Sequence, residues 1–514
     1  MSKRIDLLKI FLVGLLLFAL IFPLSYKINF FQNDDWVYYK QVTNFLNKDF
    51  VLDKSLEAAF YTQGFMAMGF ARMFSLVRLP ILTLLVSVLN FIIFTIIVYR
   101  FYVKKLIDSL LIGLTFFFAP LHIYSALGFM TDNYFLLFLL LTLLFSEYYL
   151  NTNKKIYFVL VNMSALAGFF VRQLSVISLL ALITQLVIKK KYVSACIQTL
   201  LTSALLVYYF KYFPTTSEMN KYQGFRYTNL TNFGQLFTLN YVFVFYALCF
   251  VLPILVVPMI SYVKSIGTKK ALLFVALSVL IFCTYYSVFS PKLLRSADMY
   301  FIAECLGRSG FFYGDTMGLK YHIINEHVLF THWQLITEMM VAMFLSFLVF
   351  KFKKVFNIYF VYALFYMGVM SIMLRLYDRY MLPLIPIFLL GFLSLFDHLT
   401  FSKIARVFMS IGLFVLIFYV YNLAMDFVLL NGTIYANAST IHETLGVKNR
   451  DISAGYAWQQ NYCNRDENYK YMFYFQPLYT RKDWKNVYEE VGSFEVKYPL
   501  NFFDGPKVYL FKRL

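Results

Sequence analysis

Two adjacent carboxylates follow the first long apolar run of the chain, in the stretch FFQNDDWVYYKQV. Asp34 and Asp35 stand out because only 14% of the residues are charged and the formal net charge is +19. A carboxylate in a loop can be a solvated or hydrogen-bonded structural group, a ligand of a divalent metal, or a general base that takes a proton from an attacking hydroxyl. Two like charges so close together raise one pKa, which a nearby cation could offset.

Further polar residues fall in three later segments of the chain. They are His122, Thr131, Asp132 and Asn133 in PLHIYSALGFMTDNYF, Arg172 and Gln173 in GFFVRQLSV, and Arg375, Asp378, Arg379 and Tyr380 in MLRLYDRYMLP. Each has an ordinary structural explanation, since an acid favours a helix N-terminus and an arginine can anchor a hairpin at the lipid headgroups. Their joint position on one face, in the topology that the loop charges favour, is the main functional signal of the sequence.

The elements that position these residues are apolar helices. Hydrophobic residues make up 61% of the 514 residues and aromatic residues 21%. Apolar runs long enough to cross a bilayer recur along the chain, which predicts a mainly α, polytopic membrane protein of about 13 transmembrane helices. The expected spans are 7–25, 82–101, 107–121, 133–150, 156–171, 174–188, 193–213, 239–262, 271–290, 334–350, 355–373, 380–397 and 405–424.

Charge in the connecting loops orients these helices. With the N-terminus in the cytoplasm every inner loop is basic, as the positive-inside rule requires; residues 189–191, all lysine, are an example. The apolar segment 58–77 is expected to lie at the outer membrane surface as an amphipathic helix instead of spanning the bilayer. The outer face then contains 26–81, 122–132, 172–173, 214–238, 291–333, 374–379 and 425–514.

Two parts are expected along the chain. Residues 1–424 form the transmembrane catalytic domain, with 26–81 as its first outer loop, and the opening apolar run is taken as a retained first helix. The polar tail 425–514 contains YKYMFYF, SFEVKYPL and KVYLFKRL, which indicate short strands and predict a small α/β extracytoplasmic domain. Cys305 and Cys463 both fall in outer segments, where one disulfide between them could form.

The sequence resembles the GT-C superfamily of membrane glycosyltransferases, in particular the branch of protein O-mannosyltransferases and the lipid A aminoarabinose transferase. Asp34, Asp35 and Tyr38 match the family pattern of Asp, then Asp or Glu, then two residues, then Tyr. APLHIYSALGFMTDNYFLLFLLL, where Asp132 matches an acid of the second outer loop, and RYMLPLIPIFLL are similar to later family segments. The resemblance covers roughly residues 5–400. The chain departs from it with VRQ, where many relatives have a Thr-Lys pair, and with Asp35 in place of Glu.

This resemblance implies sugar transfer on the outer face, from a polyprenyl-phosphate sugar donor to a lipid, glycan or protein acceptor. Asp34 would be the base that activates the acceptor hydroxyl, with Asp35 as the second candidate. Direct attack would invert the anomeric carbon, and the phosphate leaving group needs positive charge instead of an acid. The expected phosphate-binding residues are Arg172, Arg375 and Arg379, and the expected substrate-binding residues are Tyr38, Asp132, Gln173 and Tyr380.

Cofactors and location are also part of this expectation. The sequence establishes no cofactor and leaves metal dependence open; a divalent metal could be held by Asp34, Asp35 and His122. The expected partners are the donor, the acceptor and membrane lipids, without nucleic acid. Richness in Lys, Phe, Asn and Tyr is typical of an AT-rich bacterial genome, which predicts a bacterial cytoplasmic membrane protein with its N-terminus inside and its C-terminus and active site outside.

Three other functions are compatible with the same helices. They are a lipid-linked sugar transporter or flippase, a non-catalytic membrane scaffold, and an oligosaccharide ligase or polymerase. A transporter needs ionisable groups near mid-membrane and helices broken by Gly or Pro. Here the unusual charges gather at predicted helix ends, which disfavours transport. The early acidic pair fits a ligase or polymerase poorly.

Overall fold

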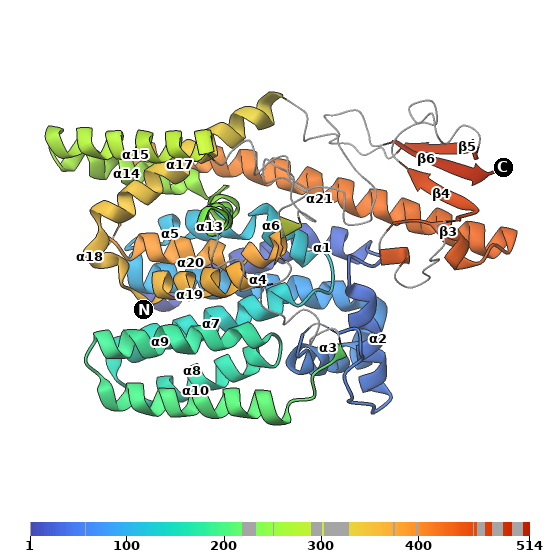
Figure 1. Ribbon diagram of the computed structural model, residues 1–514, viewed down its shortest axis with the longest axis horizontal. Coiled ribbons are helices and arrows are strands. Elements are labelled where there is room, and N and C mark those ends of the chain that lie inside the picture. Colours follow the sequence, from blue (N-terminus) through green and yellow to red (C-terminus); the bar gives the residue numbers. More distant parts are fainter. Residues whose placement is uncertain are drawn as a thin grey trace.

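A computed structural model shows a mainly helical chain with a small group of strands near its C-terminus (Figure 1). It describes residues 2–56, 58–217, 233–249, 251–288, 301–302, 328–373, 376–396, 399–455, 457–459, 468–474, 487–495 and 507–514. Arg375 and the predicted disulfide between Cys305 and Cys463 lie outside the described residues.

The helices run through most of the described chain. They are α1 Ser2–Tyr26, α2 Asp35–Leu46, α3 Tyr61–Phe74, η1 Leu76–Arg78, α4 Leu79–Ile97, η2 Val98–Tyr102, α5 Leu106–Phe117, α6 Pro120–Ala126, α7 Asp132–Thr152, α8 Lys155–Phe169, η3 Gln173–Ser175, α9 Val176–Ile188, α10 Tyr192–Tyr212, α13 Phe233–Leu248, α14 Leu252–Ser265, α15 Thr268–Val288, α17 Val328–Phe350, α18 Phe352–Val355, α19 Ile358–Ile372, η5 Asp378–Met381, α20 Leu384–Leu393, α21 Lys403–Leu445 and η6 Asn449–Asp451. Side chains between these helices form a continuous apolar core.

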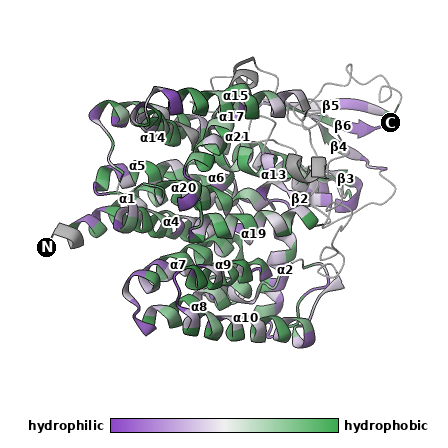
Figure 2. Cartoon of the chain, turned by 60° about the vertical axis from the view of Figure 1, so that its left-hand side comes forward, coloured by the Kyte–Doolittle hydropathy of each residue, from purple (hydrophilic) through white to green (hydrophobic). Residues whose placement is uncertain are grey.

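The apolar helices are those of a membrane-embedded protein, with hydrophobic residues over the bundle and hydrophilic ones on β5, β6 and the helix ends (Figure 2). Within the described residues, six helices are long and apolar enough to cross a membrane, or seven if the bent pair α5 and α6 is one span. Shorter apolar helices of 10–17 residues lie in several other expected spans. The expected count of about 13 spans is therefore not confirmed, and the orientation stays a prediction.

Two of the expected spans are broken in the structure, each next to a proline. The expected span 239–262 is divided between α13 and α14, with Pro253 in the first turn of α14. The expected span 107–121 crosses a bend of 65° between α5 and α6, and Pro120 begins α6. Proline lacks the N–H that a continuing helix needs, yet it suits the first turn of a new helix.

The described part of the first outer loop contains the short helices α2, α3 and η1. α3 coincides with most of the segment 58–77 that was expected to be an amphipathic surface helix, and it is not among the candidate spans of the described chain. It buries Gln63 and Phe70, whereas Met73 and Phe74 are exposed. In Figure 1, α2 and α3 lie toward the same end of the molecule as the strands, and the N-terminus lies toward the other end.

One continuous helix joins the bundle to the strands. α21 runs past residue 424, the expected domain boundary, and ends at Leu445, where Gly446 adopts the left-handed conformation (φ 63°) common after a helix. The strands beyond it are β3 Ile452–Ser453, β4 Tyr471–Tyr474, β5 Tyr488–Glu495 and β6 Lys507–Arg513, in the sheet order β3-β4-β6-β5. β3 and β4 are parallel, and the other pairs are antiparallel.

The strand expected from SFEVKYPL is shifted in the structure. β5 begins at Tyr488, before that segment, and ends at Glu495; residues 496–500 lie outside the described residues. Its first half carries Glu489 and Glu490, and charge on an edge strand protects it from pairing with other chains. Because of these charges, the first half of β5 lacks the apolar pattern from which strands are predicted. The other two predicted strands contain β4 and β6.

A polar network fixes the ends of α7 and α19 that lie away from the unusual outer residues. One carboxylate oxygen of Glu147 accepts hydrogen bonds from the hydroxyls of Tyr102 (2.7 Å) and Tyr359 (2.9 Å). A second pair joins α5 to α21, where Arg406 Nε lies 2.5 Å from Asp108 Oδ1. The Glu147 contacts therefore hold in register α7, which begins at Asp132, and α19, which leads to Arg379.

Candidate functional site

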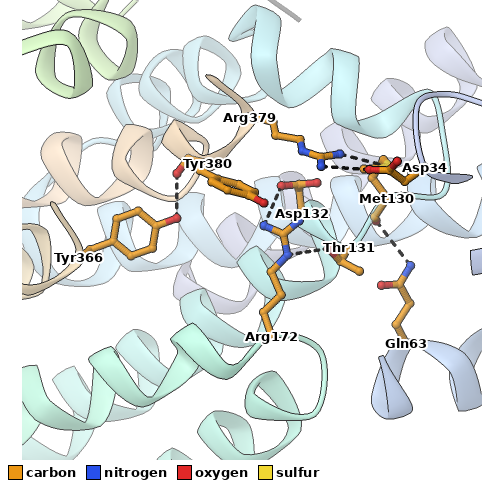
Figure 3. Close-up of polar contacts among 9 residues, drawn as sticks. All are labelled: Asp34, Gln63, Met130, Thr131, Asp132, Arg172, Tyr366, Arg379 and Tyr380. Atoms are coloured by element: carbon orange, nitrogen blue, oxygen red, sulfur yellow. Dashed lines mark hydrogen bonds and ion pairs between the residues drawn. The ribbon is translucent and has the colours of Figure 1, made fainter. Parts of the chain in front are cut away.

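Four segments far apart in the sequence meet at one place. The turn before α2 supplies Asp34, the start of α7 supplies Asp132, the α8–α9 turn supplies Arg172, and η5 supplies Arg379 and Tyr380 (Figure 3). Two ion pairs and one shared aromatic ring connect these side chains. The structure thus brings together five of the residues that the sequence singles out, and their chemical roles stay predictions.

The first ion pair joins the turn before α2 to η5. Arg379 Nη2 lies 3.2 Å from Asp34 Oδ2, and its Nη1 donates to Met130 Sδ at 3.7 Å. The Arg379 side chain is 3% exposed, whereas that of Asp34 is 23% exposed. Asp34 is the N-cap residue of α2, and its side chain makes no capping hydrogen bond. The Asp34 carboxylate is therefore paired with a buried cation yet remains partly exposed to solvent.

The second ion pair is more deeply buried. Arg172 Nη1 lies 3.1 Å from Asp132 Oδ1, and Arg172 Nε donates to Thr131 Oγ1 at 2.6 Å. The side chains of Asp132 and Arg172 are 2% and 10% exposed. Asp132 is the first residue of α7, where a negative charge is stabilised by the helix dipole. The pair fixes the start of α7 against the α8–α9 turn.

Tyr380 connects the two guanidinium groups. The Cζ of Arg172 lies 5.2 Å from the centroid of the Tyr380 ring, and the Cζ of Arg379 lies 5.7 Å from it, both within the range of cation–π contacts. The Tyr366 hydroxyl donates to the Tyr380 carbonyl at 2.8 Å and fixes this part of η5. Each guanidinium has five N–H donors, so an arginine can hold a carboxylate and a phosphate together.

Asp35 is placed differently from Asp34. It is the first residue of α2 and is 1% exposed, and its Oδ2 accepts the backbone N–H groups of Gln32 (3.2 Å) and Phe129 (2.9 Å). Burial raises the pKa of Asp35 to about 8, although these two hydrogen bonds oppose the rise. Asp35 therefore points into the protein, whereas its neighbour lies at the accessible site.

The other predicted substrate-binding residues, Tyr38 and Gln173, follow Asp34 and Arg172 closely in the sequence. Tyr38 is buried, and its ring stacks on that of Phe60 with centroids 5.1 Å apart. Phe60 has φ 57°, which is unusual for an aromatic residue, and its N–H donates to the carbonyl of Val171. Gln173 is half-buried at the start of η3, directly after Arg172.

The predicted metal-binding set is not brought together. His122 is buried in α6, where its Nδ1 lies 2.9 Å from the carbonyl oxygen of Phe117. In the part of the chain that the structure describes, no group of three or more His, Cys, Asp or Glu side chains could hold a metal ion. Asp34, Asp35 and His122 therefore do not fit a common metal site.

Sequence reasoning missed the residues that hold the end of α6 and the turn before α7, which comprises residues 127–131. Gln32 Nε2 donates to the Tyr124 carbonyl at 3.0 Å, and Gln63 Nε2 donates to the Phe129 carbonyl at 3.2 Å. Met130 supplies the sulfur that Arg379 contacts. A signal was present for Gln63, which is an isolated amide in an otherwise apolar helix and is fully buried. Buried polar side chains of this kind need hydrogen-bond partners.

Gly128, in the same turn, leaves no room for a larger residue. A Cβ atom there would overlap Gln32 Oε1 and lie 2.9 Å from Asp35 Oδ2. We expect Gly128→Ala to displace Gln32 and to lower the free energy of unfolding by about 1–3 kcal/mol. Gly69→Ala is the matched control, because Gly69 is an exposed position of α3 and a Cβ there meets nothing within 4 Å. Thermal unfolding of the two purified variants checks this, and equal midpoints would contradict it.

Comparisons with protein-family models, with curated proteins and with solved structures give no match to this chain. A functional conclusion therefore depends on the chemistry of the site and on the motif resemblance described above.

Proposed function

We propose that this protein is a membrane glycosyltransferase that moves a sugar from a polyprenyl-phosphate donor to an acceptor hydroxyl at the outer membrane surface. The observation that carries the proposal is the accessible carboxylate of Asp34 beside a buried guanidinium, with a second guanidinium across the Tyr380 ring. A carboxylate can accept the proton of the attacking hydroxyl, and the cations can receive a phosphate leaving group.

The proposed reaction is a direct displacement. The acceptor oxygen attacks the anomeric carbon and loses its proton to the Asp34 carboxylate, while the bond from that carbon to the phosphate oxygen breaks. The electron pair of the broken bond remains on the phosphate, where Arg379 and Arg172 stabilise the charge. Attack from the face opposite the phosphate inverts the anomeric carbon. One carboxylate is sufficient, because the phosphate leaves without being protonated, unlike the leaving group in glycoside hydrolysis.

The surroundings of the site suit a donor with a lipid tail. α3 belongs to the same outer loop as Asp34, and it exposes Phe65, Met73 and Phe74. Arg78, the last residue of η1, lies over the ring of Tyr26 at the end of α1, with its Cζ 3.7 Å from the ring centroid. Exposed apolar side chains beside a cation and an aromatic ring are typical of the membrane interface. A polyprenyl chain could lie in the bilayer while its sugar phosphate reaches the site.

Transfer in membranes tests this proposal. Membranes that contain the full-length protein would be supplied with a radiolabelled pool of polyprenyl-phosphate sugars, and label would be followed from the donor to other lipids, glycans and proteins. We expect the label to move only when the protein is present, with release of polyprenyl phosphate. A labelled donor that crosses the bilayer with its sugar–phosphate bond intact would instead support a transporter, and an unchanged donor would support a scaffold.

A further inference from the structure

A single carboxylate oxygen joins the first outer loop to the turn before α7. Asp35 Oδ2 accepts the N–H of Gln32, three residues earlier, and the N–H of Phe129, 94 residues later. Both hydrogen bonds are buried, and so is the Asp35 side chain. A buried backbone N–H that loses its partner cannot bind water instead, so loss of this contact would destabilise the protein.

Two glutamine side chains of the same outer loop bind the end of α6 and this turn. Gln32 donates to the carbonyl of Tyr124, and Gln63 donates to that of Phe129. We call the three residues Gln32, Asp35 and Gln63 the turn clamp. All three are at most 1% exposed. The clamp therefore fixes both the N–H and the carbonyl of Phe129, in a segment without regular structure, and it holds the end of α6 before that segment.

The clamped turn carries groups of both ion pairs. Met130 contacts Arg379, which also holds Asp34. Thr131 accepts a hydrogen bond from Arg172, which also holds Asp132. A shift of the turn would therefore move both guanidinium groups relative to Asp34. Misplacement of a reacting group by about 1 Å can lower an enzymatic rate about 100-fold.

We propose that Asp35 is a positioning residue, whose buried carboxyl group fixes the turn before α7 so that Asp34, Arg379 and Arg172 keep the geometry needed for transfer. The inference rests on the proposed function for its activity measurement. The two adjacent acids then have separate roles: Asp34 contacts the substrate, and Asp35 fixes the turn before α7.

The positioning role of Asp35 depends on its protonation state. The groups that face Asp35 are Asp34 before it in the chain, Arg379 from η5, Tyr39 from α2 and Tyr134 from α7. Burial raises the pKa of Asp35 to about 8 from an ordinary value of 3.8, and the negative charge of Asp34 adds to this rise. The neutral acid accepts two N–H groups through Oδ2, and ionisation would place a buried negative charge beside the charge of Asp34.

The sign of the pH dependence follows from this shift. In the folded protein Asp35 is protonated below about pH 8, so transfer should fall as the pH rises through that value. In the unfolded chain it loses its proton near 3.8, so its contribution to stability is full below that pH and is lost as the pH rises to about 8. An asparagine at this position removes both effects, because its amide does not titrate.

Three variants of the full-length protein in nanodiscs test the proposal with the labelled polyprenyl-phosphate sugar pool. Asp35→Asn keeps an acceptor oxygen for both N–H groups, and we expect it to retain at least about one third of the wild-type rate. Asp35→Ala leaves both N–H groups unsatisfied, and a loss of about 10- to 100-fold is expected. Asp34→Asn should be inactive. An Asp35→Asn protein as inactive as Asp34→Asn, or a fully active Asp35→Ala protein, would overturn the proposal.

Two pH profiles complete the test. The transfer rate of the wild type should fall between about pH 7 and 9, and that of Asp35→Asn should stay level there. Without substrate, the thermal midpoint of the wild type should fall relative to Asp35→Asn as the pH rises from about 5 to 8. Parallel profiles in either measurement would overturn the proposal. The stability profile needs no transfer, so the failure of the positioning role and the failure of the proposed activity are distinguishable.

Discussion

Replacing Asp34 with asparagine is expected to abolish sugar transfer while leaving the protein folded. The side chain is partly exposed and adjoins Arg379, so an amide of the same shape fits without a cavity. The amide cannot take a proton from the acceptor hydroxyl, and loss of a general base costs about 100- to 10,000-fold in rate. The fall should appear in kcat, because the proton is transferred only in the chemical step.

Asp49→Asn is the matched control for this substitution. Asp49 is an exposed acid of the same outer loop, and its Oδ1 accepts the N–H of Val51, which an asparagine oxygen can also accept. We expect Asp49→Asn to transfer sugar at the wild-type rate. Donor binding, measured with the labelled lipid, should persist in Asp34→Asn. If the Asp34→Asn protein transfers sugar as fast as the control, Asp34 is not the general base.

Breaking the buried pair between Asp132 and Arg172 should produce the largest loss of stability. Arg172→Met would leave the Asp132 charge buried without its cation, and removal of one partner of such a pair costs about 3–5 kcal/mol. The same substitution removes one of the two cations offered to the phosphate. Thermal unfolding in detergent measures the first effect, and transfer from the labelled donor measures the second.

The double substitution Asp132→Leu with Arg172→Met separates these two effects. Two apolar side chains of similar size can replace a buried ion pair with little loss of stability. We therefore expect the double variant to recover most of the wild-type thermal midpoint but none of the transfer lost in Arg172→Met. Recovery of both properties would mean that Arg172 has only a structural role, and recovery of neither would show that the pair cannot be replaced.

Much of this arrangement could be predicted from the sequence. Apolar runs indicated the helices, because a helix surrounded by lipid or by other apolar helices is apolar along most of its length. Charges that were placed on one face from loop signs alone, Asp34, Asp132, Arg172 and Arg379, do meet in the structure. A charged side chain is costly in apolar surroundings, so its presence signals a partner even before the partner is known.

The pairing itself could not be predicted. Nothing in the sequence distinguishes Asp34 with Arg379 from Asp34 with Arg172, because the choice depends on how η5 and the α8–α9 turn pack. The different burial of Asp34 and Asp35 depends on the start of α2, which directs two adjacent side chains to different surroundings. Pro120 and Pro253 mark the two helix breaks in the sequence, but a hydropathy profile does not distinguish a broken apolar segment from a continuous one.

The most direct test of glycosyl transfer is the fate of a single defined donor with the purified protein. A synthetic polyprenyl-phosphate sugar of known anomeric configuration would be incubated in proteoliposomes with an acceptor fraction from the same membranes, and the products analysed by mass spectrometry and NMR. We expect free polyprenyl phosphate and a glycosidic bond of inverted configuration. An intact donor, or a product of retained configuration, would contradict this expectation.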